Sequence, residues 1–392
     1  MNNIFKNIIP LLENFTKIGP AGCAISISLN GENVFEHYHG FADTEKGSPV
    51  TRDSIFRMYS NTKMLTITAA MKLYEKGLFL LNDPIEEYLP EFACPMVCRY
   101  TGNNVMTIEP SAKSITIRDL FTMCSGITYE GEHNLTQSGI AKIKNEFEKK
   151  GGYGTREFVK ALAGVPLAFV PGSHWNYGLS HDVVGALIEV VSGKQFGRFL
   201  KDEIFDPLQM NDTGFFITDA RRPRLTTLYR RQDGKLVPNY DDDFNYEAAH
   251  RYESGGAGIL STLPDMTRFA AMLVAGGTLD GERILSRKTI DLMRSNHLSE
   301  GPLRDFEKAC AAGKWEFLSG YGYGLGVRVM IDPSKGGCNG TVGEYGWAGA
   351  AGTWMLVDPE ERLTVVYLHQ LKPDNREEYC HPRLRAAIYG EL

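Results

Sequence analysis

Strand-forming segments lie at both ends of this chain, and helix-forming segments lie between them. Near the start, residues 23–29 alternate larger apolar with small side chains, as a strand in a sheet does. An Asn-Gly pair at residues 30–31 indicates a hairpin that leads to a second strand at residues 34–39. Strand-like composition returns near the end, at residues 325–331, 353–357 and 363–369. The pattern predicts one sheet assembled from both termini.

The stretch between these strands is mainly helical. Residues 61–76 place apolar side chains at helical spacing and stop before Gly77, a typical C-terminal cap. Further helices are expected at residues 116–123, 181–192, 266–275 and 376–389. The predicted fold class is α/β (α+β), with an antiparallel sheet flanked by helices. We expect a single domain with an active site between two lobes, an α/β lobe of about residues 1–60 plus 250–392 and a mainly helical inserted lobe of about residues 61–249.

Composition excludes several classes of protein. The net charge is −6 and no Lys/Arg-rich run occurs, so we expect no nucleic-acid partner. No apolar stretch approaches the roughly 20 residues of a membrane span, so no membrane partner is expected. The seven cysteines are odd in number and scattered, which favours reduced thiols. No small-residue cleavage pattern follows the first residues, so a cytoplasmic location is predicted.

The most informative short motif is Ser60-Asn61-Thr62-Lys63, an S-x-x-K sequence at the start of a predicted helix. Residues three apart lie on one helical face, so Lys63 would lie beside Ser60. The first N–H groups of a helix have no partner within it, and the N–H of Ser60 would bind a developing oxyanion. A neutral Lys63 would accept the serine proton. The alternative is a capping serine and a solvated lysine, and the motif alone does not decide between them.

The chain contains no G-x-S-x-G sequence, so it lacks the nucleophile elbow of the α/β-hydrolases. A serine-hydrolase interpretation is therefore narrowed to the serine–lysine type. The surrounding sequence supports that type. Residues 56–63, FRMYSNTK, resemble the nucleophile segment of the serine β-lactamase-related superfamily, which includes class C β-lactamases, D-amino-acid peptidases and family VIII carboxylesterases. Further similar stretches follow in the family order, at residues 77–92, 120–126, 171–177, 207–213, 254–262 and 346–353.

This resemblance spans roughly residues 20–370 and implies a β-lactamase/penicillin-binding-protein-like fold with Ser60 as nucleophile. The second family motif is usually Tyr-x-Asn and here is Tyr177-Gly178-Leu179. The resemblance implies that Tyr177 relays a proton between Ser60 and the leaving group, although it could instead be a core or cleft aromatic residue. Leu179, in place of the asparagine, and Tyr129, a second phenol in the loop after residues 125–126, are assigned to substrate binding.

The third motif is usually Lys-Thr-Gly or His-x-Gly and here is Trp347-Ala348-Gly349. An indole replaces the cation that helps bind a substrate carboxylate, and it offers an apolar wall and one N–H donor. This substitution resembles the carboxylesterase branch, so Trp347 and Gly349 are expected to bind a neutral, apolar ester. The same alignment makes the N–H of Ala350 the second oxyanion donor. Sheet packing is the alternative role for Trp347.

Weak metal-binding patterns occur at residues 37–39, 94–98 and 241–243. Each is better explained by surface histidines, ordinary thiols or a solvated acidic loop, so neither a metal nor a cofactor is predicted.

The sequence predicts a carboxylesterase that forms an acyl-enzyme on Ser60 and acts on small-molecule esters with small or medium apolar acyl groups. The alternatives are a β-lactamase, a D-aminopeptidase or amidase, an acyltransferase, or a catalytically silent binding module. The oligomeric state is left open.

Overall fold

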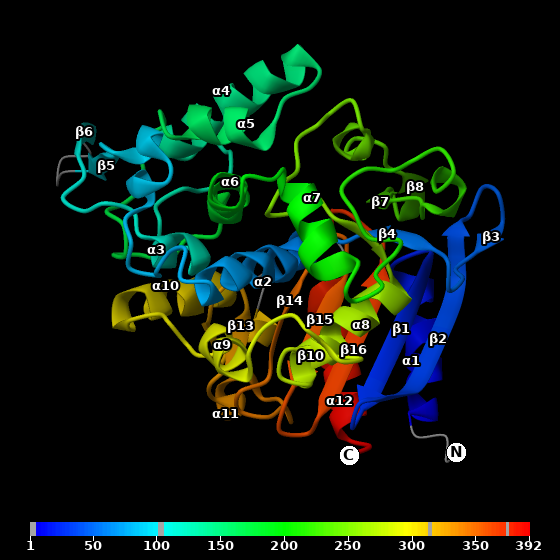
Figure 1. The fold of residues 1–392 in the computed structure, drawn as a ribbon. Helices are drawn as coiled ribbons and strands as arrows, with labels where there is room; N and C mark the ends of the chain where they lie inside the picture. Colours follow the sequence, from blue (N-terminus) through cyan, green and yellow to red (C-terminus); the bar gives the residue numbers. More distant parts are fainter. Residues whose placement is uncertain (1–4, 101–105, 313–315, 374–375) are drawn as a thin grey trace.

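A central antiparallel sheet organises the molecule (Figure 1). The computed structural model describes residues 5–100, 106–312, 316–373 and 376–392, and within them eight strands form this sheet. In spatial order the strands are β12 (Tyr321–Tyr323), β13 (Arg328–Met330), β14 (Tyr345–Ala348), β15 (Trp354–Asp358), β16 (Leu363–His369), β1 (Gly22–Leu29), β2 (Glu32–Asp43) and β3 (Ser48–Pro49). Because β1 lies between β16 and β2, the predicted sheet from both termini is confirmed.

The two faces of the sheet are covered by different helices. In β1, Cys23, Ile25 and Ile27 belong to a cluster with α1 (Ile9–Ile18) and α12 (Glu377–Tyr389). Ala24 belongs instead to the main core, on the face against which α8 (Leu263–Val274) packs. Every residue of β1 before Leu29 is buried, so both faces of the sheet are shielded from solvent at its centre. Asn7 Nδ2 donates to Glu391 Oε1 at 2.6 Å, so the two ends of the described chain meet.

The inserted region is built around α2 (Thr62–Glu75), which packs against α6 (Ser180–Ser192). Side chains all around the first three turns of α2 are buried, so it is the central helix of this region. The predicted capping box is confirmed at α3 (Ile117–Phe121), where Thr116 and Asp119 bond reciprocally. The other helices are α4 (Leu135–Lys150), α5 (Thr155–Leu162), α7 (Phe196–Leu200), α9 (Arg287–Met293), α10 (Glu300–Ala311) and α11 (Pro333–Gly336).

Two expectations for the elements need correction. The strand expected at residues 325–331 is shorter, since only β13 (Arg328–Met330) forms there and Gly324–Val327 form a turn after β12, with Gly326 at a φ of +70°. The inserted region also contains the hairpins β5–β6 and β7–β8, which the pattern did not indicate. The short paired strands are β4 (Ile55–Arg57) with β9 (Leu260–Thr262), β5 (Met96–Tyr100) with β6 (Met106–Pro110), β7 (Tyr229–Gln232) with β8 (Lys235–Pro238), and β10 (Thr278–Leu279) with β11 (Glu282–Arg283).

In the described part of the chain, no helix is long and apolar enough to cross a membrane. Within the same residues, no group of three or more His, Cys, Asp or Glu side chains is placed to hold a metal ion. All seven cysteines are free thiols.

Candidate active site

The nucleophile segment leads from β4 into the central helix α2. Met58 follows β4, and its N–H donates to the carbonyl of Ile259 at 2.8 Å, which ties the segment to β9. A 3-10 turn at Tyr59–Asn61 then runs directly into α2. Ser60 therefore lies where backbone N–H groups lack partners from within the helix, as the motif predicted. It is 9% exposed.

The residue before Ser60 adopts a strained conformation. Tyr59 has a φ of +45°, a left-handed conformation that costs a residue with a Cβ about 1–2 kcal/mol. Its hydroxyl donates to Asp242 at 2.7 Å, and the Nζ of Lys372 lies 4.7 Å from its ring centre. Lys372 is also paired with Asp242. These contacts hold the sharp turn that presents Ser60 at the end of α2.

Lys63 lies one helical turn after Ser60 and is completely buried. Its Nζ donates to Ser60 Oγ at 3.1 Å, to the hydroxyl of Tyr129 at 3.2 Å and to the carbonyl of Gly256 at 2.7 Å. A Cβ on Gly256 would lie 3.4 Å from that Nζ, so the absent side chain leaves room for the lysine. A hydroxyl directly bonded to a buried amine is the pair that serine–lysine nucleophilic catalysis requires.

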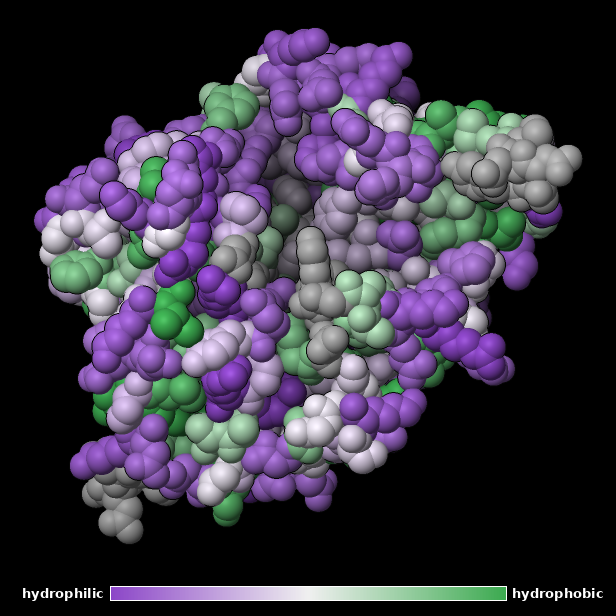
Figure 2. Space-filling view, turned by 180° about the vertical axis from the view of Figure 1, so that it is seen from behind, coloured by the Kyte–Doolittle hydropathy of each residue, from purple (hydrophilic) through white to green (hydrophobic). Residues whose placement is uncertain are grey.

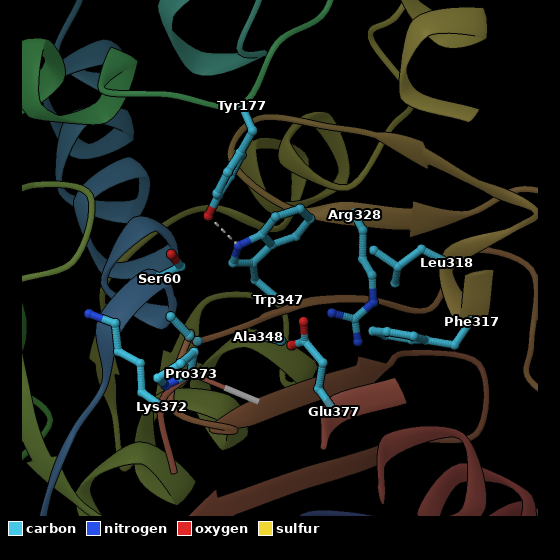
Figure 3. A pocket seen from close by; sticks show the side chains of 12 residues that line it. Ser60, Tyr177, Phe317, Leu318, Arg328, Trp347, Ala348, Lys372, Pro373 and Glu377 are labelled. Atoms are coloured by element: carbon cyan, nitrogen blue, oxygen red, sulfur yellow. Dashed lines mark hydrogen bonds between the residues drawn. The ribbon is translucent and has the colours of Figure 1, made fainter. Parts of the chain in front are cut away.

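Two tyrosines flank this pair in different ways. Tyr129 bonds Lys63, and burial raises the pKa of its phenol well above the ordinary value, so Tyr129 is a neutral phenol. Tyr177 presents its ring to Lys63, with the Nζ 4.6 Å from the ring centre. The hydroxyl of Tyr177 accepts a hydrogen bond from Trp347 Nε1 at 2.9 Å (Figure 3). The rings of Tyr129 and Tyr177 meet edge to face, with their centres 5.5 Å apart.

The second side of the site is the end of β14. A Cβ on Gly349 would lie 2.3 Å from the carbonyl oxygen of Met58, so only a glycine lets the end of strand β14 contact the nucleophile segment. Thr353 fixes the contact, because its Oγ1 donates to the same carbonyl at 3.0 Å and its own carbonyl accepts from the N–H of Gly349 at 2.8 Å. Ala350, the next residue, lines one pocket together with Ser60.

This pocket has a volume of about 290 Å³ and is mostly apolar. Ser60, Tyr177 and Trp347 form one side of it, Arg328, Leu318 and Phe317 lie across from them, and Lys372, Pro373 and Glu377 lie below (Figure 3). Its remaining lining residues are Ala348, Gly349 and Ala350. On the face of the molecule seen in Figure 2, a hollow opens near the centre and mainly hydrophilic residues surround it.

The sequence profile of the family described as Beta-lactamase matches residues 11–389. The chain belongs to the β-lactamase family. Protein Rv1367c of Mycobacterium tuberculosis is 31% identical, over 86% of this chain and 82% of that protein. Esterase EstB of Burkholderia gladioli is 26% identical, over 94% of this chain and 91% of the esterase. The family match and the esterase relative place the chain among the serine hydrolases of the β-lactamase fold.

A solved structure gives the same fold. Unliganded simvastatin synthase (LovD) from Aspergillus terreus superposes with a TM-score of 0.84 at 22% sequence identity, covering 100% of this chain and 99% of that chain. This likeness concerns the fold. The predicted superfamily and fold class are confirmed.

The structure gathers most of the predicted site residues of this β-lactamase-family chain around one pocket. Ser60, Tyr177, Trp347, Gly349 and Ala350 line it. Tyr129 and Lys63 lie behind that lining and bond each other. Leu179 is placed differently. It caps α6, is 7% exposed, packs in the main core and is not among the pocket-lining residues. The role of each residue stays a prediction.

A buried carboxylate near the lysine was not predicted from the sequence. Asp182 on α6 is completely buried, and its Oδ1 accepts from the hydroxyls of Tyr252 and Ser254, both at 2.6 Å. Its Oδ2 has no hydrogen-bond partner in the described residues, and it lies 2.7 Å from a Cβ built on Gly256. Asp182 and Lys63 therefore pack on the same glycine. An aspartate within an apolar helical stripe was the signal available in the sequence.

A buried histidine also lies beside the lysine. His181 precedes Asp182, and burial, followed by the positive charge of Lys63, lowers its pKa to about 3. His181 is therefore neutral at ordinary pH and adds no charge beside Lys63.

The acidic run at residues 241–243 braces the nucleophile segment, whereas a solvated loop was the expectation. Asp242 accepts from Tyr59, and Asp243 is paired with the buried guanidinium of Arg57 in β4 at 2.5 Å. Asp241 pairs with Arg230 at 3.2 Å. A hydrogen bond from Tyr59 and an ion pair with Arg57 explain two of the three carboxylates.

Proposed function

We propose that the protein is a serine carboxylesterase that forms an acyl-enzyme on Ser60. The observation that carries this proposal is the 3.1 Å hydrogen bond between Ser60 Oγ and Lys63 Nζ at the wall of an apolar pocket. Among the residues that the structure describes, Lys63 is the base whose side chain bonds this hydroxyl. A hydroxyl needs such a base because serine is a weak nucleophile at its own pKa.

The reaction would proceed through two acyl transfers. Ser60 Oγ attacks the ester carbonyl carbon while its proton passes to Lys63, and the carbonyl oxygen becomes an oxyanion held by the N–H groups of Ser60 and Ala350. The carbon–oxygen bond to the leaving group then breaks, and Tyr177 delivers a proton to the departing alkoxide. Lys63 then passes the serine proton to the Tyr177 phenolate. In the second half, water attacks the acyl-enzyme carbonyl and gives one proton to Lys63, the bond from Ser60 Oγ to the acyl carbon breaks, and Lys63 returns that proton to Ser60 Oγ as the acid is released.

The indole of Trp347, in place of a cation, supports an ester over a β-lactam as substrate. The family cation that helps bind a β-lactam carboxylate is replaced here by an indole, whose single N–H already donates to Tyr177. That donor is therefore unavailable to a carboxylate placed beside Tyr177. The esterase relative EstB is consistent with this assignment.

Transfer of the acyl group to an alcohol is the second candidate. The same acyl-enzyme serves both reactions, and the mostly apolar lining of the pocket favours an organic acceptor over water. Adding a primary alcohol to the ester assay and measuring the new ester against the free acid distinguishes transfer from hydrolysis.

The test of the proposal is hydrolysis of p-nitrophenyl butyrate. We expect turnover by the wild type and a loss of about 10⁴-fold or more in Ser60→Ala, since the covalent step is removed. Ser138→Ala, which changes an exposed serine on α4, is the matched control. An alkyl phosphonate should add one adduct to the Ser60 peptide in mass spectrometry. Wild-type-like activity in Ser60→Ala, or labelling elsewhere, would contradict the proposal and favour another nucleophile, whereas no turnover by the wild type would favour the silent binding module.

A further inference from the structure

The active-site pocket contains a buried arginine that the proposed chemistry does not use. Arg328 lies on β13, is 1% exposed, and lines the pocket across from Ser60 (Figure 3). Burial lowers the pKa of its guanidinium, although an arginine stays charged at any ordinary pH. A charge taken out of water is unfavourable by several kcal/mol unless another group compensates it.

The contacts of Arg328 leave that charge largely uncompensated. Among the described residues, its Nη2 donates to the carbonyl of Met355 over a long 3.5 Å, and the hydroxyl of Tyr321 is a second polar contact that favours the charged form. Its Nε has no hydrogen-bond partner in the part of the chain that the structure describes, and its guanidinium carbon lies 5.3 Å from the ring centre of Tyr321. No carboxylate in the described residues lies within ion-pair distance of it. Within the described residues, the cation therefore has aromatic and polar contacts but no carboxylate in direct contact.

The nearest buried acid is committed elsewhere. Glu344 is completely buried, and its Oε1 binds Arg385 at 3.3 Å and the hydroxyl of Tyr321. Its Oε2 accepts from Tyr389 at 2.7 Å. Glu344 thus compensates Arg385 directly, and it acts on Arg328 only over a longer distance. The other cation of the pocket, Lys372, is already paired with Asp242.

The open edge of strand β14 lies between Ser60 and Arg328. β13 pairs with β14 only through Arg328 with Gly346 and Val329 with Tyr345. The last residues of β14, Trp347 and Ala348, thus have no β13 partner on their outer edge. Both line the pocket, so it continues along this open edge from Ala350 toward Arg328.

We propose that Arg328 is a subsite for a carboxylate at the far end of the acyl chain of the substrate. The inference rests on the proposed esterase function and specifies its substrate class, a half-ester of a dicarboxylic acid or a similar acyl group with an anionic end. A guanidinium binds a carboxylate through two parallel N–H donors, which supplies the missing anion. Phe317 and Leu318 would pack on the methylene chain between the two ends.

The position of Tyr177 assigns the carboxylate to the acyl part. The leaving group must lie beside the group that protonates it, and Tyr177 lies on the Ser60 side of the pocket (Figure 3). Arg328 lies across from Tyr177, beyond Trp347.

The first test uses the wild type alone. We compare the mono-p-nitrophenyl esters of adipate, pimelate and suberate, which keep one free carboxylate, with the neutral mixed diesters in which that carboxylate is a methyl ester. Uncatalysed hydrolysis is subtracted from each rate. We expect the acidic ester of the best chain length to have a kcat/KM about 10-fold or more above its neutral counterpart, a preference that decreases with added salt. Esters that carry the carboxylate on the alcohol should show no such preference. Neutral esters preferred at every length, or an equal gain with the carboxylate on the alcohol, would overturn the inference.

The second test removes the charge. Arg328→Met should reduce the acidic-to-neutral ratio of kcat/KM by about 10-fold or more, and Arg328→Lys should keep part of it. Arg304→Gln removes one positive charge from an exposed side chain on α10 and should leave the ratio unchanged. Because the readout is a ratio within one protein, a partly unfolded variant still gives an answer. An unchanged ratio in Arg328→Met contradicts the subsite.

Failure of this inference is distinguishable from failure of the proposed function. If the wild type hydrolyses neutral esters through Ser60 without preferring acidic ones, the esterase stands and the subsite falls. If no ester is hydrolysed, the esterase proposal itself fails.

Discussion

The two tyrosines beside Lys63 differ in the atoms they present. Tyr129 directs its hydroxyl to the amine, whereas Tyr177 presents its ring to the amine and its oxygen to Trp347. Since Tyr177 also lines the pocket and Tyr129 does not, a leaving group meets the Tyr177 hydroxyl first. We therefore assign proton delivery to Tyr177 and the positioning of Lys63 to Tyr129.

This assignment predicts unequal losses for two equivalent substitutions. Tyr177→Phe should lower kcat for a butyl ester by about 100-fold or more, the usual contribution of general acid–base catalysis. Tyr129→Phe should lower it by about 10-fold, the value of one neutral hydrogen bond. An activated p-nitrophenyl ester should reduce the loss in Tyr177→Phe, because its leaving group needs no proton. A larger loss in Tyr129→Phe with both esters would reverse the two roles.

At this scale the sequence predicted residues that belong to motifs and missed residues that meet across the fold. Ser60 and Lys63 are neighbours in the chain, so helical spacing placed them together. Asp182 and Gly256 reach Lys63 from separate segments, and no local pattern reports such a meeting. The hydrogen bond from Trp347 to Tyr177 likewise joins residues far apart in the sequence.

Among the elements, the N-terminal end of α7 shows how a short helix is held by acids. Glu189 accepts from the N–H of Phe196 at 3.0 Å, and Glu253 accepts from the N–H of Gly197 at 2.7 Å. Burial, followed in the same direction by the negative charge of Glu189, raises the pKa of Glu253 to about 7. The folded state therefore holds this carboxyl protonated where the unfolded chain has released the proton.

The sign of the resulting pH dependence follows from linkage. Between the unfolded value of 4.5 and the folded value of about 7, the folded state binds more protons, so stability falls as pH rises through this window. Glu253→Gln keeps an oxygen acceptor for Gly197 and removes the titration. We predict that it is more stable than wild type at pH 8 by up to about 3 kcal/mol, with little difference at pH 4. Chemical denaturation at pH 4 and pH 8 measures the free energy of unfolding of both proteins. Glu282→Gln, on the exposed strand β11, is the control. An equal change in stability at the two pH values would contradict the prediction.

Elements with strong local signals were predicted, and those without were not. The capping box of α3 and the apolar stripe of α6 lie within single segments, so both helices were found. The strand expected at residues 325–331 began too early, because apolar and glycine residues of the turn before β13 continue its pattern, and the three residues of β12 were not predicted. The hairpins β5–β6 and β7–β8 were missed because their strands are mostly exposed on one side or short, which weakens the alternation.

In the whole molecule, one core runs through both predicted lobes. A single cluster of buried side chains contains Ala24 and Leu368 from the sheet as well as Leu65 and Val184 from α2 and α6. The inserted region is therefore not a separately packed unit. The lobe boundaries at residues 61–249 remain a prediction of the sequence, and the continuous core indicates that the lobes unfold together.

We predict one cooperative thermal transition for the whole chain. The far-UV circular dichroism curve and the tryptophan fluorescence curve should coincide, since Trp354 lies in the cluster under α1 and α12 while Trp347 lies in the main core. Two separated midpoints would show that the lobes unfold independently.

The place of β1 in the sheet has a consequence for how the protein is made. β1 ends at Leu29 and its partner β16 begins at Leu363, so at ~5–20 residues per second the first strand waits tens of seconds for its neighbour during synthesis. Ala350 is likewise made long after Ser60. A ribosome-bound chain thus carries its serine for most of translation without the segment after β14 that supplies the second donor of the proposed oxyanion site. Hydrolytic activity should appear only when the chain is nearly finished. The time at which activity appears during synthesis therefore reports when the sheet is completed.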